Sequence, residues 1–226
     1  MKKIDITFLP SIKGNYYDDD LIIDWCKKLN DSFDFINTYI PKNAEEAKIF
    51  LKKSNAAYGA LTKDLIGHCN NVQWLQVPQA APPPDFYYDE LINHPMIATN
   101  FRGIYNDHIS HHILAMILSF SRSLNLYIHQ QSKRMWMPIT SDIGSTRYLP
   151  EMKIMIIGLG GIGDETARLC SYFGSEIIGV DERRRDKPDY VSKLIKPENL
   201  NIYLNDADFV ISTIPHTPNT EKIFNY

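Results

Sequence analysis

The stretch Lys153–Asp181, KIMIIGLGGIGDETARLCSYFGSEIIGVD, constrains the fold of this chain more than any other. It opens with an almost continuously apolar run, as in a strand that is buried on both faces of a parallel sheet. A knot of glycines follows, then apolar residues at helical spacing up to Gly174, and then a second apolar run, EIIGV. Strand, helix and strand in this order predict a βαβ unit, which requires a parallel sheet.

The glycines of this unit fill the pattern G-x-G-x-x-G with Gly158, Gly160 and Gly163. The first glycine permits a tight turn, the second lets the backbone approach a pyrophosphate, and the third lets the helix pack closely on the strand. The amides and the dipole at the start of the helix favour a phosphate there. Asp181 stands about 20 residues further on, where an acidic residue accepts a hydrogen bond from the adenine ribose. The stretch therefore predicts a dinucleotide site.

The residues around Asp181 also bear on which dinucleotide binds. Its carboxylate would repel the 2′-phosphate of NADP, which favours NAD. Arg183 and Arg184 follow shortly after and could compensate for this repulsion. NAD is thus the expected cofactor, and the sequence leaves NADP open.

Residues 1–100 alternate short apolar runs with amphipathic stretches. We expect strands in the segments IDITFL, FDFINTYI, AAYGAL, VQWLQV and MIAT, with helical segments between them, one of which begins at Asn43. This alternation is typical of an α/β domain with a parallel sheet. The stiff loop VPQAAPPPD follows one strand and is either a wall of a ligand site or a plain connector.

One long helix is expected over residues 107–129, where apolar residues recur at helical spacing. Its start places His108, His111 and His112 on one face, an arrangement that can bind zinc. No second cluster of Cys, Asp or His with clear ligand spacing accompanies them in the sequence. We therefore expect no metal site.

The net charge, the apolar segments and the cysteine spacing argue against several classes of protein. The 226 residues carry a net charge of −3, which provides no field that would gather nucleic acid or an acidic membrane. The N-terminus does not read as a secretory signal, and the most apolar long segment carries too many polar residues for a membrane span. Cys26, Cys69 and Cys170 are widely spaced, which favours reduced thiols in a cytoplasmic protein.

Four segments together carry a resemblance to a known family: VQWLQVPQAAPPPD, IATNFRGIYNDHISHHILAMILSFSR, the glycine stretch ending in GVD, and DADFVISTIPHTPNT. From about Val72 to its end, the chain resembles the D-isomer-specific 2-hydroxyacid dehydrogenase family. The resemblance implies an α/β protein with a flavodoxin-like domain over residues 1–100 and a Rossmann NAD-binding domain over residues 101–226. It implies that this Rossmann domain is incomplete, with about three of the usual six strands.

The resemblance also implies site residues. The cofactor would lie against the G-x-G-x-x-G pattern, called the fingerprint below, against Asp181 and against the P-x-T-P-x-T segment. The residues are Gly158, Gly160, Gly161, Ile162, Gly163, Asp181, Pro215, Thr217 and Thr220. The backbone amides of Ala80 and Ala81 would hold the substrate carboxylate. Two positions depart from the family, which usually has a glycine at Ala81 and a glutamate at His111. A backbone φ above zero at position 81 would be strained with alanine in place of glycine.

By resemblance, the function is hydride transfer between NAD(H) and a small 2-hydroxy or 2-keto acid, by a homodimer. The family's catalytic arginine, acidic residue and histidine lie beyond the P-x-T-P-x-T segment, so we expect a truncated chain without them and assign no catalytic residue. The alternatives are a non-catalytic NAD-binding or interaction protein and an inactive remnant.

Overall fold

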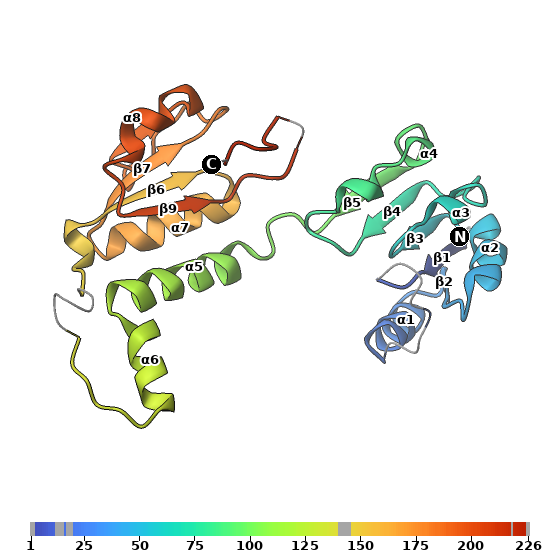
Figure 1. Ribbon diagram of the computed structural model, residues 1–226. Helices are drawn as coiled ribbons and strands as arrows, with labels where there is room; N and C mark the ends of the chain where they lie inside the picture. The colour runs from blue at the N-terminus through green and yellow to red at the C-terminus, as the bar shows by residue number, and fades with distance from the viewer. Residues whose placement is uncertain (1–2, 12–15, 17–19, 140–145, 218, 225–226) are drawn as a thin grey trace. The chain divides into compact units, whose positions relative to one another are not determined.

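The computed structural model describes residues 3–11, 16, 20–139, 146–217 and 219–224. The chain divides into two compact units, Met1–Arg102 and Gly103–Tyr226. Each unit is built on one parallel sheet with helices packed against it (Figure 1).

The first unit alternates strands and helices, as its sequence predicted. The strands are β1 (Ile4–Phe8), β2 (Ile36–Tyr39), β3 (Ala56–Tyr58), β4 (Trp74–Val77) and β5 (Ile97–Asn100). The helices are α1 (Asp20–Ser32), α2 (Ala44–Lys53), α3 (Lys63–Ile66), α4 (Asp89–Ile92) and the 3-10 turn η1 (Pro84–Phe86). All strand pairs are parallel in the order β2-β1-β3-β4-β5. This is the flavodoxin order, so the predicted fold of this unit is confirmed.

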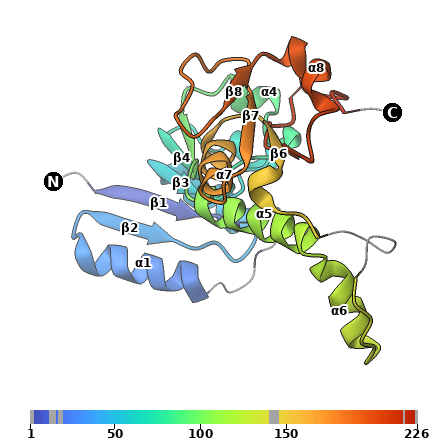
Figure 2. The same cartoon turned by 90° about the vertical axis from the view of Figure 1, so that its left-hand side faces the viewer.

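Helices cover both faces of the first sheet. On one face, Leu75 and Val77 of β4 pack with Leu51 of α2 and Leu65 of α3. On the other, Phe8 of β1 packs with residues of α1, which Figure 2 shows lying along β1 and β2. Consecutive strand residues point to opposite faces, so each strand can contribute apolar side chains to both of these cores.

The second unit contains a sheet of four parallel strands. The strands are β6 (Lys153–Ile157), β7 (Glu176–Val180), β8 (Lys193–Ile195) and β9 (Phe209–Ser212). The helices are α5 (Asn106–Ser121), α6 (Leu124–Ser132), α7 (Gly161–Tyr172), α8 (Leu200–Leu204) and the turns η2 (Leu149–Glu151) and η3 (Pro197–Asn199). The order β8-β7-β6-β9 corresponds to positions 3-2-1-4 of the Rossmann sheet, which confirms the predicted fold. The expectation of about three strands missed β8, which is too short to show a period.

Alternating residues of β6 supply two separate cores. Ile154 and Ile156 are fully buried on the face covered by α7, where Ile117 of α5 joins them. Met155 and Ile157 are buried on the opposite face, against residues of α8 and its flanks. Because β6 is buried on both faces, it holds the turn that follows it firmly in place.

The prediction of one helix over residues 107–129 is wrong. α5 ends at Ser121, and Ser123 adopts a φ of 54° before α6 begins. The Ser121 hydroxyl donates to the Leu118 carbonyl (3.2 Å), and the Ser121 carbonyl accepts from the Arg147 amide (2.7 Å). Serine side chains compete for the backbone partners of a helix, so the break falls among serines although the apolar spacing continues.

Two expectations from composition have structural counterparts. All three cysteines are free and buried, as predicted for reduced thiols. Within the described ranges, none of the helices combines the length and the apolar character needed to cross a membrane.

The start of α2 gives a first test of the fold. Asn43 is the N-cap of α2, as predicted, since its Oδ1 accepts from the Glu46 amide (2.9 Å). The Glu46 carboxylate in turn accepts from the Lys42 amide (2.9 Å). We expect Asn43→Ala to lower the free energy of unfolding by about 1 kcal/mol in urea titrations. Asn43→Asp keeps the acceptor and should stay close to wild type; equal losses in both variants would contradict the cap.

Candidate functional site

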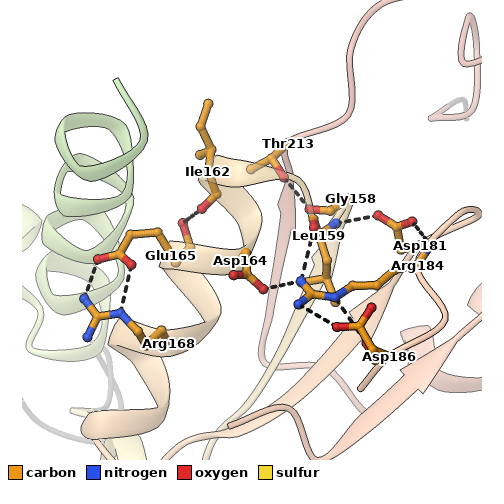
Figure 3. Close-up of polar contacts among 11 residues, drawn as sticks. Gly158, Leu159, Ile162, Asp164, Glu165, Arg168, Asp181, Arg184, Asp186 and Thr213 are labelled. Atoms are coloured by element: carbon orange, nitrogen blue, oxygen red, sulfur yellow. Dashed lines mark hydrogen bonds and ion pairs between the residues drawn. The ribbon is translucent and has the colours of Figure 1, made fainter. Parts of the chain in front are cut away.

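Strand β6 passes into helix α7 through a turn that glycines shape (Figure 3). Gly158 has a φ of 92°, and a Cβ there would lie 2.9 Å from Ile214 Cγ2. A Cβ on Gly163 would lie 1.9 Å from the Gly158 carbonyl oxygen. No side chain fits at that distance, so the helix can approach the strand this closely only with glycine at position 163. The structure thus shows the tight turn and the close helix packing that the glycine spacing predicted.

Gly160 differs from the other two glycines because the fold does not require it. It is exposed, its backbone is extended, and a Cβ would meet nothing within 4 Å. It is the N-cap of α7 and has no side chain to accept hydrogen bonds from the first amides of the helix. Those amides have no partner within the helix. Amide donors and the positive end of the helix dipole therefore border an open space, which fits the pyrophosphate of a dinucleotide.

Asp181 lies at the end of β7 and anchors the turn. Its Oδ2 accepts from the Leu159 amide (2.8 Å), and its Oδ1 accepts from the amides of Arg183 and Arg184 (2.8 Å each). Partial burial acts to raise the pKa of Asp181, but the three amides outweigh it, so the pKa lies below its ordinary value. The carboxylate is therefore charged at neutral pH.

A guanidinium braces the same turn from the β7 side. Arg184 Nη1 donates to the Leu159 carbonyl (3.3 Å) and forms an ion pair with Asp164 in the first turn of α7 (Figure 3). Lys196, just beyond β8, donates from Nζ to the carbonyls of Asp181 (3.3 Å), Glu182 (2.7 Å) and Arg184 (3.4 Å). Lys196 thus holds the loop after β7 through the carbonyl oxygens of the loop, while the Asp181 carboxylate holds it through two amides.

The end of β9 closes the turn from its other side. Thr213 Oγ1 donates to the Gly158 carbonyl (2.7 Å). The predicted cofactor residues of the P-x-T-P-x-T segment follow β9. Thr220 Oγ1 lies 2.6 Å from the Pro215 carbonyl and accepts from the Thr217 amide (2.8 Å). These three residues form one local turn that leaves β9 beside the fingerprint. Their contact with a cofactor stays a prediction.

Helix α5 contributes a polar side chain to the start of α7. A Cβ on Gly161 would lie 2.3 Å from Asn106 Nδ2, so the two helix starts touch. One turn further along α7, the pKa of Glu165 is lowered, mainly by the hydrogen bond from Arg168 and to a smaller extent by His111 of α5. The histidine that departs from the family pattern therefore acts electrostatically on a carboxylate of α7.

The other predicted site residues lie in the first unit, in the loop after β4. The Asn100 side chain donates to the Ala80 carbonyl (2.8 Å), and the Gln79 side chain donates to the Ser11 carbonyl (3.1 Å). Neither Ala80 nor Ala81 has a positive φ. Alanine in place of the family's glycine thus causes no backbone strain in this loop.

No cluster of metal ligands accompanies these features. Across the described ranges, no group of three or more His, Cys, Asp or Glu side chains is arranged to hold a metal ion.

The fold and the fingerprint turn define a class, the Rossmann-type domains that bind a dinucleotide where a strand passes into a helix. Residues 114–226 match the family described as D-isomer specific 2-hydroxyacid dehydrogenase, NAD binding domain, and the chain belongs to this family. NAD is accordingly the cofactor of this domain.

Relatives and solved structures agree with this family. The chain is similar to a D-lactate dehydrogenase of Streptococcus pyogenes serotype M1, with 26% identity over 189 residues, which cover 82% of this chain and 55% of that protein. The chain thus spans about half the length of the curated relatives it matches. Its fold is similar to a family member from Aeromonas salmonicida (TM-score 0.81, 23% identity, covering 99% and 68% of the two chains). A second similar fold is D-lactate dehydrogenase from Aquifex aeolicus, complexed with NAD and lactic acid (TM-score 0.71, 18% identity, 95% and 62%).

Sequence reasoning missed several residues that fix the turn. Thr213 and Lys196 each follow a strand directly, as Asp181 does, and ligands of such sheets bind at the carboxyl ends of the strands. The place of these residues after apolar runs could have marked them. Asn106 and Asp164 left no comparable signal, because each depends on which helix packs beside which.

The charge of Asp181 predicts a pH dependence of stability. Because its folded pKa is lowered, the stability it adds is present above its unfolded pKa and is lost as the pH falls through the folded pKa. We expect Asp181→Asn to be less stable than wild type at pH 7. The difference between the two proteins in urea titrations should shrink as the pH falls below the unfolded pKa of aspartate, about 4; a difference independent of pH would contradict this role.

Proposed function

We propose that residues 101–226 bind NAD(H) at the fingerprint turn, and that the chain serves an oxidoreductase of the D-2-hydroxyacid dehydrogenase type. Gly160 is the observation that carries the proposal. The fold leaves open space where its side chain would stand, whereas the glycines at 158 and 163 are required by packing. A glycine that packing does not require, at the start of a helix, suits the close approach of a pyrophosphate.

The residues of the chain would bind and orient the cofactor. The amides at the start of α7, from Gly160 to Gly163, would hold the pyrophosphate. The Asp181 carboxylate has about four acceptor positions, of which three amides use three, so one remains for a ribose hydroxyl. Pro215, Thr217 and Thr220 would lie along the far side. When bound, NAD supplies the acceptor for a hydride from a hydroxyl-bearing carbon.

We further propose that residues 1–100 contact the substrate, a small 2-hydroxy or 2-keto acid such as lactate or glyoxylate. The amides of Ala80 and Ala81 would donate to its carboxylate. Asn100 and Gln79 support this assignment because their hydrogen bonds anchor the loop at residues 79 and 80. The name of the streptococcal relative, D-lactate dehydrogenase, supports the substrate class.

The remaining assignments concern the setting of the protein. We propose a cytoplasmic homodimer without nucleic acid or membrane partners. The free buried thiols support the compartment. Exposed apolar side chains on α5 and α6, among them Met116, Phe120 and Ile128, support a dimer through these helices.

We assign no catalytic residue to the 226 residues. Binding of NADH without turnover is therefore expected of this chain alone, and a non-catalytic NAD-binding or interaction protein is the alternative function.

Gly160→Val tests the proposed pyrophosphate site at the start of α7, here called the cradle. We expect the variant to keep its melting temperature within a few degrees and to lose NADH binding at least tenfold in calorimetric titrations, since the side chain would occupy the phosphate space. Gly67→Val is the matched control, because a Cβ at Gly67 also meets nothing within 4 Å and lies in the first unit. Equal NADH affinity in Gly160→Val and wild type would reject the cradle.

Turnover tests the absence of catalytic residues. The 226-residue chain, mixed with NADH and either pyruvate or glyoxylate, should show no loss of absorbance at the NADH band above the rate without protein. Steady oxidation that depends on the keto acid would show that this chain holds a proton donor we have not assigned.

A further inference from the structure

Arg184 starts beside the predicted ribose site but does not point toward it. Its backbone amide donates to Asp181 Oδ1 (2.8 Å), so its Cα stands next to the carboxylate that the ribose would meet. The side chain runs from there to the first turn of α7 (Figure 3). A guanidinium this close to the ribose would be expected to favour a 2′-phosphate, since arginine binds phosphate in a bidentate manner.

The guanidinium is occupied by other partners in the structure. Nη1 pairs with Asp164 and donates to the Leu159 carbonyl (3.3 Å). Nη2 lies 3.4 Å from the Asp186 carboxylate, and Nε donates to the Asp186 carbonyl (3.2 Å). The side chains of Arg184 and Asp164 are 20% and 33% exposed, whereas that of Asp186 is 84% exposed. Asp164 is thus the more shielded of the two carboxylate partners and the one that directs the side chain toward α7.

We propose that Asp164 is a specificity-determining residue, which favours NAD over NADP by holding Arg184 away from the 2′ position of the ribose. The inference rests on the proposed binding of NAD at this turn. With the pair in place, a 2′-phosphate meets the charge of Asp181 without the guanidinium of Arg184. Without Asp164, Arg184 can turn about its own side chain and face that phosphate.

The rest of the loop is built to stay in place during such a turn. Lys196 binds three backbone carbonyls of the loop, those of Asp181, Glu182 and Arg184 itself. Asp181 holds the amides of Arg183 and Arg184. Neither set of bonds involves the guanidinium or Asp164. Loss of the ion pair therefore leaves Arg184 with the Leu159 carbonyl and the exposed Asp186 as partners, while the loop backbone stays held.

The test compares the dissociation constants of NADPH and NADH for the same variant. In Asp164→Ala, we expect the ratio of the NADPH constant to the NADH constant to fall about tenfold from its wild-type value, which is about 1.4 kcal/mol. The ratio cancels any change at the pyrophosphate, which both cofactors share. Asp164→Asn loses the charge and keeps an acceptor, so it should show a smaller fall and serves if the alanine variant does not fold.

A matched control breaks a neighbouring ion pair in the same helix. Glu165 pairs with Arg168 on the side of α7 that faces α5, with Arg168 Nε donating to Glu165 Oε2 (2.8 Å) (Figure 3). Glu165→Ala should leave the ratio at its wild-type value. Arg184→Ala in the Asp164→Ala background should restore the wild-type ratio, because the freed guanidinium is then gone.

The outcomes separate this proposal from the proposed function. A wild-type chain that binds no NADH overturns the proposed function and this inference with it. A wild-type chain that binds NADH, with an unchanged ratio in both Asp164 variants, overturns this inference alone. A fall in the ratio that survives Arg184→Ala also overturns it, since another residue, such as the exposed Arg183, would then meet the phosphate.

Discussion

The close approach of α7 to β6, with Gly163 against the carbonyl of Gly158, is the constraint on which the rest of the second unit depends. It brings the first turn of α7 to the end of the strand, where Asp181 and Thr213 from the neighbouring strands can reach the intervening residues. A side chain at position 163 would push the helix away and separate the amides of the helix from the strand ends. The site is therefore a consequence of packing before it is one of chemistry.

The turn between β6 and α7 is held from both sides by different kinds of groups. On the β7 side, a carboxylate and a guanidinium bind the amide and the carbonyl of Leu159. On the β9 side, a threonine hydroxyl binds the carbonyl of Gly158. Polar groups of the backbone that would otherwise face a ligand in several orientations are thus fixed before one arrives. Binding to such a pre-ordered turn loses little conformational entropy.

The sequence allowed the βαβ unit, both sheets and the packing roles of Gly158 and Gly163 to be predicted because each rests on local periodicity or on a fixed spacing. Strand β6 was predicted with its observed ends, since a doubly buried strand is apolar throughout. The long helix was predicted wrongly because apolar spacing continues across Ser123, while the Ser121 carbonyl at the break is bound by the amide of Arg147, which is distant in sequence. Contacts such as Asn106 against Gly161, or Asp164 with Arg184, arise only when helices and loops have packed, and no local pattern records them.

The reach of Thr213 back to Gly158 has a consequence for how the protein is made. The two residues are 55 positions apart, and β9 pairs directly with β6 at one end of the four-strand order. A ribosome delivers the glycine turn and its helix well before β9, so the nascent chain carries an unfinished turn with one open flank. The turn acquires its last anchor when β9 inserts beside β6. A cofactor that binds only the finished turn therefore stabilises only chains in which β9 has paired with β6. It does not stabilise earlier intermediates.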